Sequence, residues 1–215
     1  MKSKVVNSDD LPRHVFSTGD TARLVAAGIA TGVEEEAAKF TLDDVFEMMR
    51  IGALDPDAKV ELIDGRVIEM APEGVPHVRA KMQLAESLIH RAGSSVRVIV
   101  DSTLRLSATS APDPDLYLYP SALPLDAVDG ASVGLIIEVA QASLAKDLMA
   151  KAGLYARHGV RDYWVVDVAA QKIIVHRDPK EGAYGSVFTA TADELVTPLA
   201  FPHLPVRLSD LPAIR

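Results

Sequence analysis

The sequence predicts a mixed α/β (α+β) protein built around one central sheet. Short runs rich in β-branched residues alternate along the chain with amphipathic segments of helical period. Residues 135–139 form a nearly continuous apolar run, as expected for a strand that is covered on both faces. Asp64-Gly65 separates two β-rich runs, and this pair is a strong signal for a hairpin turn. Strands and helices mixed in this order indicate a central sheet flanked by helices.

Residues 1–38 differ from the rest of the chain. They hold one short helical candidate, which begins at Thr18 or Asp20 and ends at Ala30. We therefore expect an N-terminal extension with a short helix over 1–38 and the main domain over 39–215.

The main domain is expected to begin with a helix and a hairpin. Thr41 suits the N-cap of a helix over 41–50, because its hydroxyl can accept from an unpaired backbone N–H of the first turn. The strands 60–63 and 66–70 then flank the Asp64-Gly65 turn.

The remaining elements follow in order. A helix is predicted from about His77 to Ala92, and its apolar side is expected to carry Val78, Met82, Leu84, Leu88 and Ile89. Ser143 is expected to cap a helix from Leu144 to His158, which Gly159 ends. The predicted strands are 96–100 with 103–106, 116–119, 134–139, 163–167, 172–176 and 184–191, and the Pro-rich tail 198–212 is expected to close the domain.

Composition excludes several classes of protein. The 215 residues contain no cysteine, so a disulfide scaffold, a thiolate zinc site and a cysteine nucleophile are ruled out. No apolar run approaches the roughly 18 residues of a membrane span, and the N-terminus lacks a secretory signal, so a cytoplasmic protein without membrane contact is expected. The net charge of -8 argues against a sequence-independent DNA coat but is compatible with a metal-dependent nuclease.

Two acids stand at places where charge is costly. Glu138 lies at the end of the most apolar strand in the chain. Because side chains alternate along a strand, it points to the face opposite to that of its two neighbours. A buried carboxylate there must be paired, protonated or bound to a metal, although a strand end that reaches solvent would also explain it. Asp115 begins the strand 116–119, and two carboxylates on neighbouring strands can hold a divalent cation. Asp113 and Asp115 are also ordinary loop residues beside proline.

Two further charged residues have two interpretations each. Lys151 is either part of a surface ion pair with Asp147, four residues earlier, or projects over the sheet toward Glu138. In the second case its ammonium could stabilise charge on a phosphate. Glu61 is either a third inward-facing acid or part of a salt bridge at the rim.

Five segments in order resemble the Uma-type family of restriction-endonuclease-like proteins in the PD-(D/E)XK nuclease superfamily. They are VELIDGRVIEMAP with His77 after it, PDPDLYLY, LIIEVAQASLAKDLMAKAGLYARHGVRDYWVVD, VHRDPKEGAYGSV and TPLAFPHLPV. The resemblance covers about Phe40 to Leu211 and implies a restriction-endonuclease-like central mixed sheet with a divalent-metal site on adjacent strands.

The resemblance also implies roles for individual residues. Asp115 matches the acid of the PD pair, with Asp113 as a competing frame, and Glu138 matches the (D/E) acid; both would be metal ligands. The superfamily lysine would stand at Ala140, and the family pattern places a lysine on the next helix instead, which matches Lys151. Glu61 matches the acid of the ELIDG segment.

The leading hypothesis is therefore a Mg²⁺- or Mn²⁺-dependent endonuclease that hydrolyses DNA, with catalytic Asp115, Glu138, Lys151 and Glu61. A homodimer is expected, because cutting both strands of a duplex usually needs two sites. The alternative is a catalytically degenerate module that binds nucleic acid or protein, since relatives commonly have a more acidic run where this chain has Ala140-Gln141-Ala142. A third hypothesis is metal-dependent hydrolysis of a smaller phosphoester.

Overall fold

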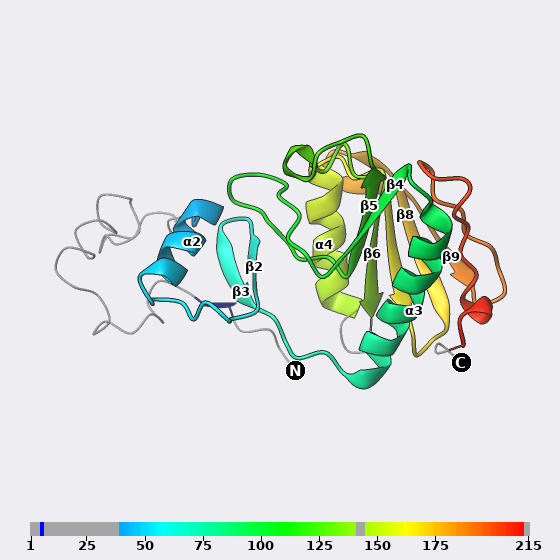
Figure 1. The fold of residues 1–215 in the computed structure, drawn as a ribbon, viewed down its shortest axis with the longest axis horizontal. Coiled ribbons are helices and arrows are strands. Elements are labelled where there is room, and N and C mark those ends of the chain that lie inside the picture. Colours follow the sequence, from blue (N-terminus) through cyan, green and yellow to red (C-terminus); the bar gives the residue numbers. More distant parts are fainter. Residues whose placement is uncertain (1–4, 7–38, 141–144, 213–215) are drawn as a thin grey trace. The chain divides into compact units, whose positions relative to one another are not determined.

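A computed structural model describes residues 5–6, 39–140 and 145–212 of the chain, with the side chains of 5–6 and 145–150 left out (Figure 1). The described chain divides into two compact units. The smaller unit contains residues 39–71 and 105–112, with strand β1 (Val5–Val6), and the larger contains the rest. The expected extension over 1–38 and its helix lie almost entirely outside the described residues, so the division at residue 38 stays a prediction.

The smaller unit confirms the predicted helix and hairpin. Helix α2 (Leu42–Arg50) begins with a capping box, in which the Thr41 hydroxyl accepts from the Asp44 N–H and the Asp44 carboxylate accepts from the Thr41 N–H. Strands β2 (Val60–Ile63) and β3 (Arg66–Glu69) pair antiparallel, and β1 pairs with the other edge of β3. Asp64 and Gly65 both have positive φ, at 50° and 81°, as a tight hairpin turn of the primed type requires.

The larger unit contains a six-stranded mixed sheet. Its strands are β4 (Val96–Val100), β5 (Leu116–Pro120), β6 (Leu135–Ala140), β7 (Asp162–Asp167), β8 (Lys172–Lys180) and β9 (Ala183–Thr191), in that spatial order. Only β6 and β7 are parallel, and helix α4 (Ala145–Arg157) connects them. The expected central mixed sheet is therefore confirmed.

Three sequence-based expectations need correction or lie outside the description. No strand forms over 103–106, because the chain turns back there and the N–H groups of Leu106 and Ser107 both donate to the Ser110 carbonyl. Helix α3 (Val75–Ala92) begins two residues earlier than expected, with Pro76 in its first turn, where a missing N–H costs nothing. The cap proposed at Ser143 lies outside the described residues.

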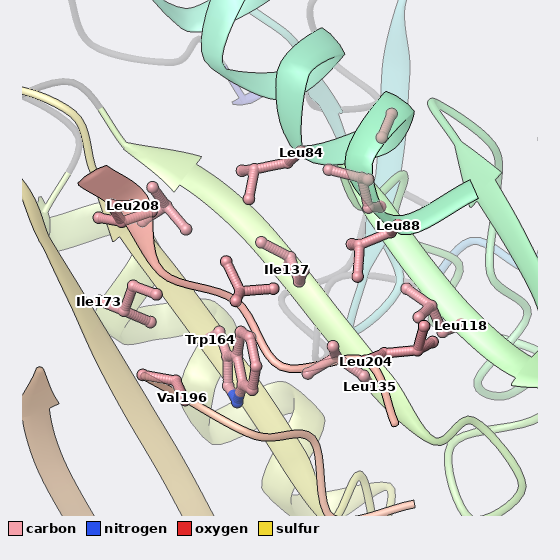
Figure 2. Packing of buried hydrophobic residues seen from close by; sticks show 14 of the residues in the cluster. Leu84, Leu88, Leu118, Leu135, Ile137, Trp164, Ile173, Val196, Leu204 and Leu208 are labelled. Carbon is pink, nitrogen blue, oxygen red and sulfur yellow. The ribbon is translucent and has the colours of Figure 1, made fainter. Parts of the chain in front are cut away.

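The two faces of the sheet are covered by different parts of the chain. Leu135 and Ile137 pack against α3 residues Leu84 and Leu88, and the C-terminal tail joins the same core through Leu204 and other residues (Figure 2). This confirms that the tail closes the domain. The opposite face packs against α4, whose Tyr155 ring lies 4.9 Å from that of Tyr163 on β7. No helix among the described residues is both long enough and apolar enough to span a bilayer.

Candidate active site at the ends of strands β5 and β6

Two buried acids lie where the β5–β6 ladder ends. Leu116 pairs with Ile137 in this antiparallel pair, so Asp115 and Glu138 are the next residues along the two strands. Asp115 is 6% exposed and Glu138 is 4% exposed. The sequence-based expectation that both acids are buried at the ends of neighbouring strands therefore agrees with the structure.

The Asp115 carboxylate bridges strand β6 and helix α3. Its Oδ2 accepts a 2.6 Å hydrogen bond from the Val139 N–H. If the ladder continued, this N–H would donate to a backbone carbonyl of β5 instead. Its Oδ1 lies 2.9 Å from His77 Nε2 and 3.6 Å from Lys81 Nζ. The side chain is thus held at the point where the strands separate, with one oxygen toward the sheet and one toward the helix.

Helix α3 adds a network of alternating charges around Asp115. The Lys81 ammonium, only 3% exposed as a residue, donates to Glu73 Oε2 and to Asp101 Oδ1, each at 2.6 Å. Glu73 Oε2 is in turn 3.6 Å from His77 Nε2. A buried lysine requires such partners, because an uncompensated charge in the interior costs several kcal/mol.

Burial and charge act in opposite directions on the pKa values of this network. Burial by itself lowers the pKa of His77, but the hydrogen bond and charge of Asp115, together with the charge of Glu73, raise it overall. Burial raises the pKa of Asp115, and the His77 contact, the Val139 N–H and Lys81 outweigh it, so the pKa falls. For Lys81, burial lowers the pKa, while Asp101, Glu73 and Asp115 raise it overall. The contacts therefore favour the charged form of each group.

Glu138 is held from the other side of the sheet. Its Oε1 accepts a 3.0 Å hydrogen bond from Lys151 Nζ and a 2.8 Å hydrogen bond from the Tyr155 hydroxyl. Lys151 and Tyr155 are four residues apart on α4 and therefore share a face of that helix. The interpretation that Lys151 projects toward Glu138 agrees with this geometry.

Glu61 lies in the smaller unit. It is buried, at 7% exposed, on strand β2, where it pairs with Ile68 of β3. Because each unit is described by itself, the role that the family resemblance implies for Glu61 stays a prediction.

Sequence reasoning missed most of the residues around Asp115. It placed His77 only at the start of a helix and after the first family segment, and it did not identify Glu73, Lys81 or Asp101. The apolar side of α3 was also wrong in part, because Met82 is 63% exposed and Ile89 is 53% exposed. The residues buried instead are His77, Ala80, Lys81, Leu84, Ala85, Leu88 and Ala92. The available signal was that His77 and Lys81 continue the helical spacing of Leu84 and Leu88.

Candidate ligands for a divalent cation lie on both sides of the sheet: Asp115 contacts α3 and Glu138 contacts α4, and Glu138 does not belong to the group of three donors that converge around Asp115. Asp115 and Glu138 both supply carboxylate oxygens, the ligands that hard cations prefer. In addition, one donor atom each of Glu73, His77 and Asp115 lies within 4.8 Å of the others, a spacing that one ion could bridge.

Comparison with solved structures supports the fold. A crystal structure described as "a putative nuclease belonging to DUF820", from Anabaena variabilis ATCC 29413, matches with a TM-score of 0.66 and 15% identity, over 81% of this chain and 98% of that one. A DrdV–DNA complex matches with a TM-score of only 0.33 and 19% identity, over 52% of this chain and 10% of that one, and we draw nothing from it. A search of curated proteins found no match.

The six-stranded mixed sheet flanked by helices defines an α+β protein with a nuclease fold. The family model described as "Uma2: Putative restriction endonuclease" matches residues 43–209, which is more than half of the chain. The chain belongs to this family, and that membership supports a nuclease function in general.

Proposed function

We propose that the protein is a metal-dependent endonuclease that hydrolyses phosphodiester bonds of DNA. The observation that carries the proposal is the pair of buried carboxylates, Asp115 and Glu138, on adjacent strands where their ladder ends. These acids would hold Mg²⁺ or Mn²⁺. Bound there, the cation would polarise the scissile phosphate and lower the pKa of a bound water.

The residues of the chain would share the remaining work. The Val139 N–H fixes the Asp115 carboxylate against strand β6, so the acid is positioned before a ligand arrives. Lys151 is 17% exposed at its side chain and contacts Glu138, so its ammonium could reach a phosphate oxygen beside that acid. The hydroxyl of the buried Tyr155 donates to the same Glu138 oxygen and helps to fix its position. Glu61 would orient water or bind a second metal, as the family resemblance implies.

Cleavage of supercoiled plasmid in Mg²⁺ tests the proposal. Glu138→Gln and Lys151→Met should each lower the cleavage rate by about 100-fold or more, since each removes charge from the reacting centre. Glu86→Gln and Lys180→Met are matched controls, because both residues are exposed and lie in other ion pairs. Circular dichroism checks that each variant is folded. Equal cleavage by wild type and by both site variants would overturn the assignment.

A second candidate is a nuclease-fold module without catalysis that binds nucleic acid or protein. Two observations favour it: Ala140 stands where the superfamily lysine would be, and cationic side chains already compensate both acids. Calorimetric titration with Mg²⁺ and Mn²⁺ distinguishes the two. Binding that Glu138→Gln abolishes supports the nuclease, and no binding by the wild type supports the module.

DNA as the substrate and a homodimer as the active form belong to the same proposal. Analytical ultracentrifugation with and without a DNA duplex would test both. The nuclease hypothesis expects two copies per duplex, because each copy contributes one pair of acids.

A further inference from the structure

We propose that Glu73, His77 and Asp115 form a second cation site, which takes a transition-metal ion such as Mn²⁺, Co²⁺ or Zn²⁺ in preference to Mg²⁺. The inference rests on the proposed function only in that both sites share Asp115. It adds two ligands that the two-acid site does not use, His77 on helix α3 and Glu73 just before that helix.

The geometry of the three donors supports a site. His77 Nε2 is 2.9 Å from Asp115 Oδ1 and 3.6 Å from Glu73 Oε2, and all three donor atoms lie within 4.8 Å of one another. His77 and Asp115 are buried, whereas the Glu73 side chain is 21% exposed and gives the cluster an opening to solvent. A metal site needs both features, converging donors and an entry path.

The donor types determine the class of ion. Mg²⁺ prefers oxygen ligands in a nearly ideal octahedron and gives up water reluctantly. Imidazole nitrogen suits Zn²⁺, Co²⁺ and other transition metals, and affinity for a mixed nitrogen and oxygen site rises along the first-row series toward copper. A site with one His77 nitrogen and two carboxylate oxygens therefore favours a transition metal.

The contacts of Lys81 are those of a cluster that stabilises positive charge. Its ammonium lies 2.6 Å from Glu73 Oε2 and 3.6 Å from Asp115 Oδ1, the same two oxygens that would ligate the ion. The ammonium also contacts Asp101, at 2.6 Å, which is not one of the three proposed ligands. Lys81 can therefore keep one carboxylate partner when an ion takes Glu73 and Asp115. In this account Lys81 is the internal counter-ion of the metal-free site and competes with the metal, and His77 releases its proton to solvent when Nε2 ligates the ion.

Absorption spectroscopy of the full chain titrated with Co²⁺ tests the site, because Co²⁺ bound through nitrogen and oxygen has visible bands. Wild type should show a saturable band, and His77→Ala should weaken Co²⁺ binding by about tenfold or more, since even the loss of an outer partner costs about that much. His90→Ala is the matched control, as His90 lies on the same helix with its side chain 77% exposed. Lys81→Met should tighten Co²⁺ binding severalfold. Glu73→Gln changes the more exposed ligand and should also weaken Co²⁺ binding. It provides a second test of the site in case His77→Ala does not fold.

The outcomes separate the two proposals. If folded His77→Ala and Glu73→Gln bind Co²⁺ as tightly as wild type, this site does not exist, whatever the protein does to DNA. If Co²⁺ binds through His77 and Glu73 but wild type fails to cleave DNA in Mg²⁺ or Mn²⁺, the proposed nuclease function fails and this site stands. Glu138→Gln should abolish cleavage and leave the Co²⁺ band in place, since Glu138 is not among the three donors.

Discussion

The α3 side and the α4 side of the sheet hold their acids in different ways. On the α3 side, the carboxylates of Glu73, Asp101 and Asp115 all lie around the single ammonium of Lys81. On the α4 side, the Glu138 carboxylate accepts from an ammonium and a phenol. The first arrangement is rich in negative charge and suited to take up another cation, whereas the second holds one acid in a fixed orientation.

The two sides also differ in their buried histidines. The pKa of His77 is raised, because Asp115 and Glu73 outweigh the effect of burial. The pKa of His176 on strand β8 is lowered, mainly because burial disfavours its charged form. His176 lies between the rings of Tyr163 and Tyr184, at 5.1 Å and 5.5 Å. The same residue type is therefore stabilised as a cation on the α3 side and as a neutral ring among the tyrosines.

Among the replacements considered, that of Lys81 should have the largest effect on stability. In the metal-free protein, Lys81→Met leaves the buried Asp115 carboxylate with one cationic partner fewer, and we expect the free energy of unfolding to fall by about 3 kcal/mol. Urea denaturation measures it. Lys180→Met, which removes an exposed ion pair, should cost less than about 0.5 kcal/mol. Equal losses in the two variants would mean that the buried α3 network contributes no more to the free energy of unfolding than an exposed ion pair does.

Replacing Tyr155 tests the other side with a smaller effect. Tyr155→Phe keeps the ring and removes one hydrogen bond to a carboxylate that also pairs with the Lys151 ammonium, so we expect a loss of about 2 kcal/mol in the free energy of unfolding. Tyr184→Phe is the control, because its hydroxyl donates to the neutral carbonyl of Val160, and its loss should be about 1 kcal/mol. A smaller loss in Tyr155→Phe than in Tyr184→Phe would mean that the bond to Glu138 contributes no more than a bond to a neutral carbonyl.

The smallest effect is expected in the pH dependence of stability. The folded-state pKa of His176 lies below its usual value of 6.5. As the pH falls, His176 therefore takes up a proton in the unfolded chain before it does so in the folded protein. The contribution of neutral His176 is thus fully present above pH 6.5 and is lost as the pH falls from there through the folded-state pKa. His176→Phe should flatten the fall in melting temperature between pH 7 and pH 5. An unchanged slope would mean that other groups control it.

The sequence predicted the fold better than the charge network, for identifiable reasons. The run 135–139 and the Asp64-Gly65 turn are local signals, and each matches the structure. Glu138 was found because an acid in an apolar strand is conspicuous, and Lys151 follows from the family pattern. Lys81 was missed because a lysine on a helix is normally exposed. Its burial depends on Asp101 and Asp115, which are 20 and 34 residues away in the chain, so no local pattern reveals it.

The hydrogen bond between Asp115 and the Val139 N–H sets a requirement on side-chain length. The carboxylate reaches from the start of β5 to the backbone of β6, at the point where the pairing of the two strands ends. Glutamate has the same charge but is longer by one methylene, about 1.5 Å of bond length. It would have to fold back or shift a strand to accept from the same N–H, so the shorter acid fits position 115 better.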